Sequence, residues 1–239
     1  MEIDRSAPAE SNRDRIIAAA AALLAEGGRE SVSTRAVSAA AGVQAPTIYR
    51  LFGDKQGLLD EVAAHGFAAH LSEKAVLEPS GDPVEDLRAG WDLNTAFGLA
   101  NPALYALMYG EPRPGSLPPA ASAALEILGA HIHRIAEAGR LVVDEERAAR
   151  LVHAVGGGTT LALIATPEEH RDLGVSRLAR EAVISAITTD APLGAPPGPA
   201  AAAIALQALL PQAPALTPGE RLLLTELLDR ITREGPPEG

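Results

Sequence analysis

The 239-residue chain contains no cysteine, so it has no disulfide framework, no thiol nucleophile and no cysteine-ligated zinc site. It lacks a run of about 18 consecutive apolar residues, the length that predicts a membrane helix. The longest candidate, 151–165, is interrupted by His153 and three glycines. The acidic, polar start MEIDRSAPAE is not typical of a signal peptide. These absences predict a cytoplasmic protein in a reducing compartment.

Basic residues are also scarce, because 20 Lys and Arg stand against 31 Asp and Glu, a formal net charge of −11. This balance argues against a protein that coats nucleic acid over its whole surface. The charge is uneven, however. Residues 76–239 carry 12 basic and 21 acidic groups, whereas the segment 33–55 has three basic residues and one acidic residue. The composition therefore allows a small DNA-reading module on an acidic body.

Alanine and leucine recur at helical spacing, and no convincing alternating run of Val, Ile and aromatic residues predicts a strand. The expected fold class is therefore all-α. Ser11 and Asp14 form a candidate capping pair for a first helix, which we expect to end at Gly27–Gly28. Two short helices are predicted next, at about 34–41 and 45–52.

The remainder of the chain predicts longer helices with proline-rich joints. Thr217 and Glu220 fit a capping box, with Pro218 in the first turn. The joint at 191–199 is too rich in Pro and Gly for regular structure. The expected helices span about 83–100, 102–109, 119–138, 144–165, 176–189, 200–210 and 218–233.

The segment 33–55 carries the functional signal. It predicts two short helices joined by a tight turn at Gly42, where glycine allows the backbone to bend sharply. Val43 is expected to anchor this turn in the core. Ile48 and Phe52 are four residues apart and should face inward together. This is the geometry of a helix-turn-helix, whose second helix can lie in the major groove of DNA.

The same residues resemble the TetR (tetracycline repressor) family over about residues 12–72. The resemblance implies an N-terminal three-helix helix-turn-helix domain at 12–72 and a larger helical ligand-binding and dimerisation domain at 73–239. The segment 101–110 also looks like a piece of the ligand domains of some members. The matching positions are Ala41-Gly42-Val43, Pro46-Thr47-Ile48-Tyr49, Phe52, Asp54, Lys55 and Leu58.

The resemblance implies DNA contacts for eight residues. Short hydroxyl donors and cationic groups suit phosphates, an arginine can reach guanine, and small apolar side chains suit thymine methyl groups. A helix N-terminus assists a lysine placed at its start. Gln44 stands where Ser or Thr commonly caps the reading helix, so this cap is expected to be poor. The candidate contacts are Thr34, Arg35, Ala45, Pro46, Thr47, Tyr49, Arg50 and Lys55.

A second candidate site comes from the aromatic residues, of which the chain has only seven. Four of them fall between positions 91 and 109. Aromatic side chains with a few polar tips commonly line small-molecule sites, although such a stripe also serves as core packing. The resemblance supplies a reason for a pocket that takes a largely apolar effector. The candidate residues are Trp91, Tyr105, Met108 and Tyr109.

No cofactor, metal site or catalytic group is predicted. His131 and His133 are two residues apart, so they point to different faces of a helix and cannot converge on one ion. The glycines at 156–158 lack the lysine and spacing of a phosphate loop and favour close approach of a partner helix. No Ser/His/Asp grouping indicates an enzyme.

We therefore expect a transcriptional regulator, a ligand-responsive repressor that binds a palindromic operator as a homodimer and is released by a small molecule. Two reading helices related by a two-fold axis can enter successive major grooves. The expected dimer helices are 144–165 and 176–189, with the helices after Pro199 left open. Two alternatives remain: an all-helical carrier or enzyme whose hairpin does not bind DNA, and a partner-binding helical adaptor.

Overall fold

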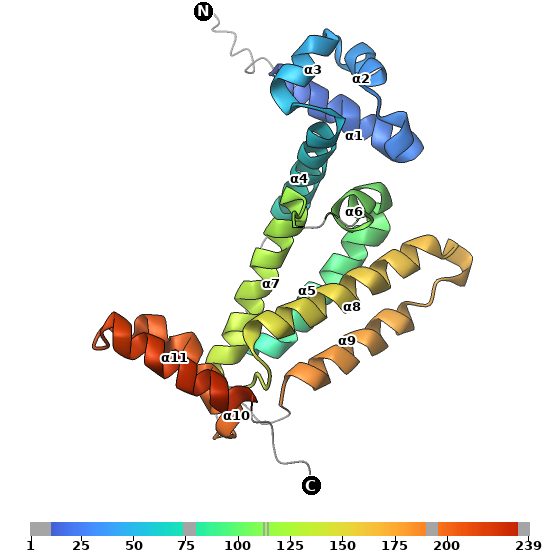
Figure 1. Ribbon diagram of the computed structural model, residues 1–239. Helices are drawn as coiled ribbons and strands as arrows, with labels where there is room; N and C mark the ends of the chain where they lie inside the picture. Colours follow the sequence, from blue (N-terminus) through green and yellow to red (C-terminus); the bar gives the residue numbers. More distant parts are fainter. Residues whose placement is uncertain (1–10, 74–79, 112, 114, 190–195, 234–239) are drawn as a thin grey trace, which may run out of the picture. The chain divides into compact units, whose positions relative to one another are not determined.

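The computed structural model describes residues 11–73, 80–111, 113, 115–189 and 196–233. The described residues form α-helices and two short 3-10 turns (Figure 1), and none of them lies in a β-strand. One isolated bridge pairs Leu141 with Thr188. The all-α fold class expected from the sequence is confirmed. The joint expected at 191–199 lies largely outside the described residues.

Two compact units divide the chain. The first comprises Met1–Val76 with Ala100–Ser122, and the second comprises Leu77–Leu99 with Ala123–Gly239. The structure therefore groups helix α6 (Pro102–Tyr109) with the N-terminal helices, whereas the sequence-based division at residue 72 had separated them.

The N-terminal helices begin and end close to the positions that the sequence predicts. Ser11 and Asp14 form the expected capping box, and Gly27 and Gly28 leave helical geometry, with φ of −137° and +66°. Backbone helix formation nevertheless resumes after these glycines as far as Ser31, whose hydroxyl donates to the carbonyl of Gly28. The four helices are α1 (Asn12–Ser31), α2 (Thr34–Ala41), α3 (Ala45–Phe52) and α4 (Lys55–Glu73).

The turn between α2 and α3 has the bend predicted at Gly42. Gly42 adopts a left-handed conformation, with φ of +63°, which costs residues other than glycine about 1 kcal/mol or more. The amide of Val43 donates to the carbonyl of Ser38 at 3.1 Å and closes the turn. Val43 itself is only half-buried, so it does not anchor the turn as expected. The core beneath the turn is built by Val37, Ala41, Ile48, Phe52 and Leu58.

Helix α6 packs on α4 within the first unit. The side chain of Leu104 packs directly on the backbone of α4 at Gly66, because a Cβ atom there would lie 2.7 Å from Cδ1 of Leu104. Arg113, just after α6, forms a bidentate pair with Asp60 of α4, with both N–O distances 2.9 Å. This packing and this ion pair tie α6 and the following segment to the helix that begins at Lys55.

The second unit is built around one apolar core. Buried residues from five helices contribute to it, including Leu87, Trp91, Ile132, Val152 and Ile184. The helices are α5 (Pro83–Ala100), α7 (Pro119–Glu137), α8 (Glu145–Ala165), α9 (Leu173–Ile187) and α10 (Pro199–Leu209), and α11 (Pro218–Arg233) follows.

Helices α8 and α9 lie side by side, joined by a connection that contains the 3-10 turn Glu168–His170 (Figure 1). Helix α9 begins three residues before the predicted position, because the carboxylate of Asp172 accepts from the amide of Gly174 at 2.7 Å and caps it. Helix α8 is long and apolar enough to cross a membrane by length and composition, but only 28% of its apolar stretch is buried. The other residues of this stretch are half-buried or exposed in the single chain.

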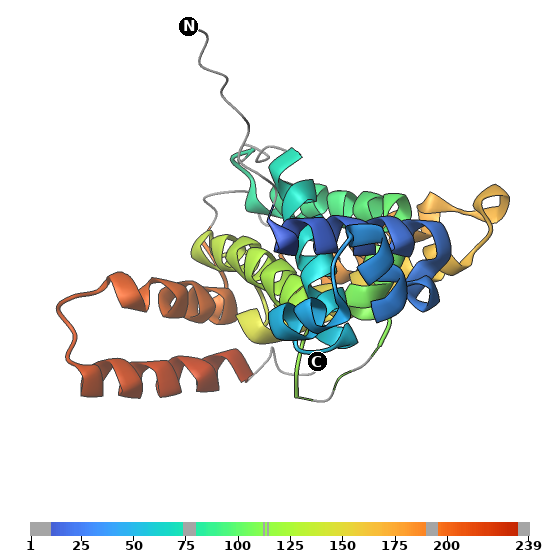
Figure 2. The same cartoon turned by 90° about the horizontal axis from the view of Figure 1, so that it is seen from above.

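The C-terminal helices form a hairpin. Figure 2 shows α10 and α11 lying next to each other, and Ile204 and Ala208 of α10 join the core that α8 and α9 share. A small cluster of Ala203, Leu210 and Leu228 joins the two helices. The predicted capping box is present, since Thr217 and Glu220 exchange side-chain to backbone hydrogen bonds.

Candidate nucleic-acid interface and effector region

The residues predicted to contact DNA lie on three consecutive elements of the first unit. Thr34 and Arg35 begin α2, five of the others lie on α3, and Lys55 begins α4. Tyr49 is 52% exposed although it is a large aromatic residue, while Ile48 beside it is 1% exposed. Helix α3 thus buries one face completely and presents the other to solvent. The exposed candidates are Arg35, Pro46, Tyr49 and Arg50, and the half-buried ones are Thr34, Ala45, Thr47 and Lys55.

The start of α3 is open, as the sequence predicts. Gln44 makes no side-chain hydrogen bond to the first turn, and Pro46 occupies a position where a missing amide proton costs nothing. Pro46 has no N–H, and the amide of Thr47 donates to the carbonyl of Gln44 at 2.9 Å. The amide of Ala45 is therefore the donor at this helix start that a phosphate or base oxygen can use.

Lys55 has a structural contact of its own. Its ammonium group donates to the carbonyl of Arg29 at 3.3 Å, so it satisfies a carbonyl at the end of α1. Next to it, the carboxylate of Asp54 accepts from the amide of Gly57 at 2.7 Å and caps α4. An ammonium group has three N–H donors, so a phosphate contact by Lys55 is compatible with this arrangement.

Two arginines of α1, which sequence analysis did not single out, hold both ends of α3. The Arg15 guanidinium donates to the carbonyl of Ala41 at 2.7 Å and to that of Gly42 at 3.4 Å, within the turn before α3. The guanidinium of Arg13 lies over the ring of Phe52, 5.0 Å from its centroid, at the end of α3. Arg13 also pairs with Glu61 at 2.7 Å. These contacts join residues 26 to 48 positions apart, so no local sequence pattern reveals them.

Trp91 and three hydroxyl-bearing residues form a buried polar network in the second unit. The indole Nε1–H donates to Oγ of Ser176 at 2.9 Å. That hydroxyl lies 3.3 Å from Oγ1 of Thr95, which in turn lies 3.4 Å from Oγ1 of Thr160. All four side chains are buried, so the network joins α5, α8 and α9 inside the apolar core. Spacing in the sequence gives no signal for a contact between residues 85 positions apart.

Gly156 explains how the tryptophan fits. A Cβ atom on Gly156 would lie 3.3 Å from Cζ3 of Trp91, so the indole ring packs directly against the backbone of α8. The prediction that glycines at 156–158 permit close approach is confirmed for Gly156. Gly157 and Gly158 have no neighbouring atom at that distance.

The other three effector-pocket candidates lie in the first unit, on α6. Tyr105 and Met108 are buried, and Tyr109 is half-buried, with its ring centroid 4.6 Å from that of Tyr105. Burial raises the pKa of the Tyr109 phenol well above its usual value, with a smaller contribution from Tyr105. The phenol therefore stays neutral and can serve as a hydrogen-bond donor over the whole physiological pH range.

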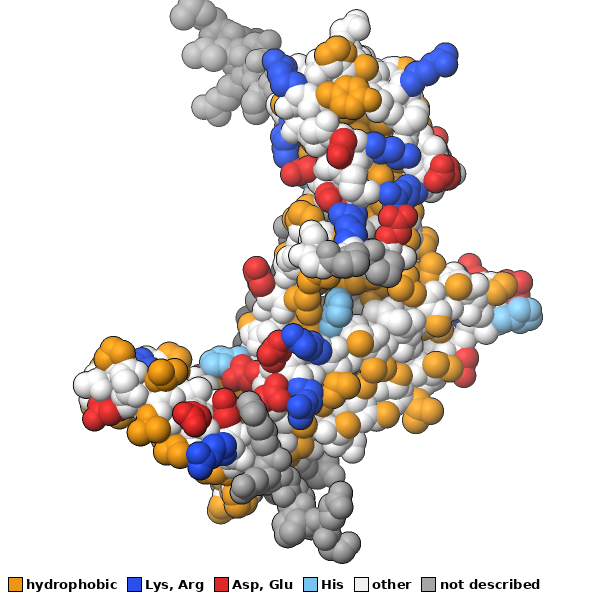
Figure 3. All heavy atoms as spheres, viewed as in Figure 1, with side chains coloured by type: hydrophobic (Ala, Val, Ile, Leu, Met, Phe, Trp, Pro, Cys, Tyr) orange, Lys and Arg blue, Asp and Glu red, His pale blue; other side chains and the backbone are white. Residues whose placement is uncertain are grey.

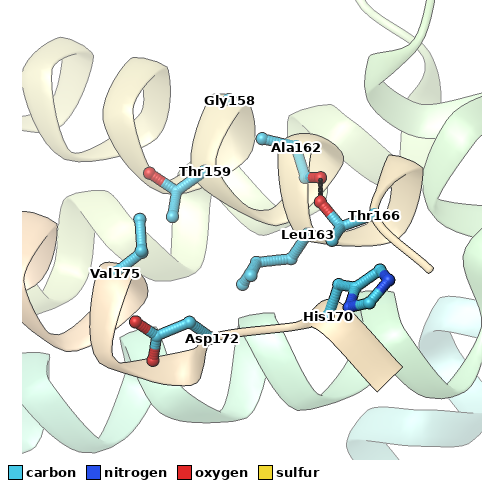
Figure 4. A pocket seen from close by; sticks show the side chains of 8 residues that line it. All are labelled: Gly158, Thr159, Ala162, Leu163, Thr166, His170, Asp172 and Val175. Carbon is cyan, nitrogen blue, oxygen red and sulfur yellow. Dashed lines mark hydrogen bonds between the residues drawn. The ribbon is translucent and has the colours of Figure 1, made fainter. Parts of the chain in front are cut away.

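A hollow of about 410 Å³ lies elsewhere, between α8 and α9 (Figure 4). Sequence analysis did not predict it, because its lining residues are of mixed type and come from both helices and their connection. The hydroxyl of Thr166 donates to the carbonyl of Ala162 at its rim. The lining residues are Gly158, Thr159, Ala162, Leu163, Thr166, His170, Asp172 and Val175.

The histidines take part in ion pairs and hydrogen bonds. His133 Nδ1 lies 3.1 Å from Glu145 and its Nε2 lies 3.6 Å from Glu137, so its two nitrogens face different carboxylates. His131 pairs with Arg134 at 2.7 Å instead. No group of three metal-ligating side chains occurs among the described residues.

Comparison with known proteins assigns the N-terminal helices. Residues 16–62 match the family model described as bacterial regulatory proteins, tetR family. This range contains α2, α3 and all eight residues predicted to contact DNA. The comparison with curated proteins found no match.

Solved structures of similar fold cover most of the chain. A protein described as a TetR-family transcriptional regulator from Vibrio parahaemolyticus is 25% identical, with a TM-score of 0.52, and covers 75% of this chain and 100% of its own. The multidrug binding protein EbrR, complexed with imidazole, is 25% identical, with a TM-score of 0.52, and the match covers 76% of this chain and 97% of EbrR. A TetR variant from Acinetobacter baumannii, in complex with minocycline, is 23% identical, with a TM-score of 0.53, and the match covers 72% of this chain and 93% of the variant.

Arg15 provides a test of how the turn positions α3. Arg15→Met keeps the aliphatic stem and removes the donors to Ala41 and Gly42. We expect a loss of about 1–2 kcal/mol in the unfolding free energy of the first unit. We also expect roughly tenfold weaker DNA binding, with an unchanged dependence on salt, because Arg15 positions α3 and does not touch phosphate. A salt slope lowered by about one unit would instead make Arg15 a phosphate ligand.

Proposed function

The chain is a TetR-family transcriptional regulator with an N-terminal DNA-binding domain, and we propose from this premise that it is a ligand-responsive repressor. It binds a palindromic operator as a homodimer, and a largely apolar small molecule releases it. Residues 12–72 bind DNA, and residues 73–239 carry the effector and dimerisation functions. Chromosomal DNA as the target places the protein in the cytoplasm, with regulation rather than catalysis as its activity.

One observation carries the proposal. Helix α3 buries Ile48 and Phe52 while it exposes Tyr49 and Arg50, and its start is free of a side-chain cap. A helix with this division of faces is ready to enter a major groove, and its tyrosine hydroxyl and arginine can reach phosphates or base edges. Arg35 and Lys55 flank it from the neighbouring helices. We assign DNA contacts to the eight residues named above on this basis.

Dimerisation through α8 and α9 is supported by the surface of these helices. The exposed face of α8 carries Leu151, Ala154, Gly158 and Ala162 at helical spacing, and small residues allow a second helix to approach closely. Leu178 of α9 is 73% exposed, and Ala182 lies one turn further on. Figure 3 shows hydrophobic side chains spread over this face, with charged groups toward its edges. Two copies facing each other here form an isologous interface.

An effector acts by population shift. We propose that it binds beside Trp91 in the second unit, as the small-molecule complexes of similar structures suggest. The effector binds more tightly to a dimer whose reading helices are too far apart or too close together for the operator. A difference of about 3 kcal/mol in its binding free energy between the two dimer conformations lowers operator affinity roughly 100-fold. The Trp91 network joins α5 to α8 and α9, so a change at Trp91 reaches the proposed dimer helices directly.

The DNA contacts can be tested by salt dependence. Selection of bound fragments from random DNA should yield a palindrome, and that site then serves as the probe. Arg50→Ala and Lys55→Ala should each weaken binding to all sequences and reduce the salt slope by about one unit per subunit, because a phosphate contact is lost. Arg230→Ala, at an exposed position of α11, is the matched control and should bind a single site normally. Absence of any saturable, salt-sensitive complex of the unmodified protein would refute DNA binding.

The effector site can be followed through Trp91, the only tryptophan of the chain. We expect apolar aromatic compounds that release operator DNA to change its intrinsic fluorescence over the same concentration range. Ser176→Ala removes the acceptor of the indole N–H and should shift the effector dose for half-release several-fold. Effectors that release DNA without any fluorescence change would place the effector site away from Trp91.

The proposed dimer interface can be tested at Leu178. Leu178→Glu puts a charge on each side of the two-fold axis, so we expect it to halve the mass of the assembly, measured by light scattering. Operator binding should fall at least tenfold, because two linked reading helices are needed. Leu117→Glu, a leucine of the first unit that is 50% exposed, is the control and should do neither. An unchanged mass for Leu178→Glu would exclude α8 and α9 as the interface.

A further inference from the structure

The hairpin of α10 and α11 exposes more apolar side chain than its own packing uses. On α11, Leu222 is 75% exposed, Leu223 57%, Leu227 41% and Ile231 43%, and only Leu228 is buried. On α10, Leu206 is 45% exposed and Leu209 39%. Leucines and an isoleucine recur on α11 at helical spacing, and a single neighbouring helix covers only part of this apolar stripe.

The apolar sector of α11 is too wide for one partner. At 100° per residue, Leu223, Leu227, Ile231, Leu224 and Leu228 span about 140°. Helix α10 covers the Leu228 edge through Ala203 and Leu210, and Gln207 bonds to Asp229 on the same side at 2.6 Å. The edge formed by Leu223, Leu227 and Ile231 faces away from α10. A helix with two apolar edges is typical of a bundle of more than two helices.

Both helices contribute to one surface. Helices α10 and α11 run antiparallel and meet through Ala203, Leu210 and Leu228 (Figure 2). With this contact fixed, the helical phases place Leu206 and Leu209 on the same side of the hairpin as the uncovered edge of α11. We call these five residues the hairpin face: Leu206, Leu209, Leu223, Leu227 and Ile231.

We propose that the hairpin face binds the same face of a second copy of this chain, in an antiparallel arrangement centred on Leu227. In this arrangement Leu223 of one copy packs against Ile231 of the other. The charges beside the stripe match: Glu226 and Arg230 lie on one flank of α11, and the two-fold axis brings Glu226 of each copy next to Arg230 of the other. The four helices of two hairpins then form a bundle in which the 140° sector is covered.

The area sets the strength of this contact. Helix α11 is about 24 Å long and the hairpin is two helices wide, about 20 Å, so a paired face buries roughly 1,000 Å² in total. This is below the ~1,200–2,000 Å² of stable complexes. The pairing is therefore weak in free solution. It becomes effective between regulator dimers held near each other on DNA, where the local concentration is high.

The inference rests on the proposed function, which supplies α8 and α9 as the stronger interface and DNA as the ligand that holds dimers near each other. Two isologous interfaces on different surfaces of one chain close four chains into a tetramer when their two-fold axes meet at right angles, which is the arrangement that we propose. Such a tetramer occupies two operators, so the hairpin face makes binding at paired operators cooperative.

Sedimentation of the full chain over a range of micromolar concentrations tests the proposal. We expect the unmodified protein to pass reversibly from dimer to tetramer. Leu227→Glu should weaken this step at least tenfold while binding to a single operator stays normal, because buried like charges face each other across the axis. Leu222→Glu is the matched control, since Leu222 lies on the same helix about 140° from Leu227 and is more exposed. An equal effect of both variants, or no tetramer at any concentration, would overturn the proposal.

A charge exchange identifies the second copy as the partner. E226R alone and R230E alone each place like charges side by side across the axis, so neither variant should form tetramers. An equimolar mixture of the two restores opposite charges at both contacts and should recover mixed tetramers. Failure of the mixture to associate, with both variants helical by circular dichroism, contradicts the pairing. Leu178→Glu separates this inference from the α8–α9 interface. This variant should lose the α8–α9 dimer and still form pairs linked through the hairpin face at high concentration.

Discussion

The left-handed backbone at Gly42, held by the guanidinium of Arg15, is the constraint on which the DNA-binding unit depends. Helix α3 is eight residues long and has no side-chain cap, so it would not be stable as an isolated helix. Its stability comes from burial of Ile48 and Phe52 and from the turn that delivers it. Arg15 neutralises the carbonyl end of α2 at the same place, where the helix dipole favours a cation. The orientation of the exposed face therefore follows from the bend.

The distribution of paired charges directs DNA to this face. In the second unit, Arg88 and Arg180 both pair with Glu181, and hydrogen bonds from Arg88 hold the pKa of that carboxyl below its usual value. Arg140 pairs with Asp82 at 2.9 Å. Internal pairing leaves little positive potential on an otherwise acidic body. Because Arg35 and Arg50 are exposed on α2 and α3, the field that attracts phosphate is concentrated at the reading helix.

Local signals in the sequence predicted most of the secondary structure. The helix caps at Ser11, Ser33 and Thr217 are hydrogen bonds between residues three positions apart, so a local sequence pattern is enough to predict them. Side-chain partners far apart in sequence could not be predicted in this way. Arg15 meets the turn 26 residues later, and Trp91 meets Ser176 across 85 residues. The spacing of the leucines on α11 likewise reveals an apolar stripe but does not say which chain covers it.

The exposed apolar surfaces of α8 and α11 both favour association, because burying them would release free energy that the single chain does not gain. Helix α8 keeps most of its apolar stretch outside the core, and α11 keeps the edge formed by Leu223, Leu227 and Ile231 in solvent. A buried leucine contributes about 1.5–3 kcal/mol relative to an exposed one, so each surface leaves several kcal/mol of burial unrealised in the single chain. The face of small residues on α8 suits close helix contact and a strong interface. The narrow hairpin face, flanked by Glu226 and Arg230, suits a weaker one whose charges select the antiparallel partner. The two surfaces therefore differ in strength because they differ in area and residue size. In the proposed assembly, dimers form first through α8 and α9, and the hairpin faces then join the dimers.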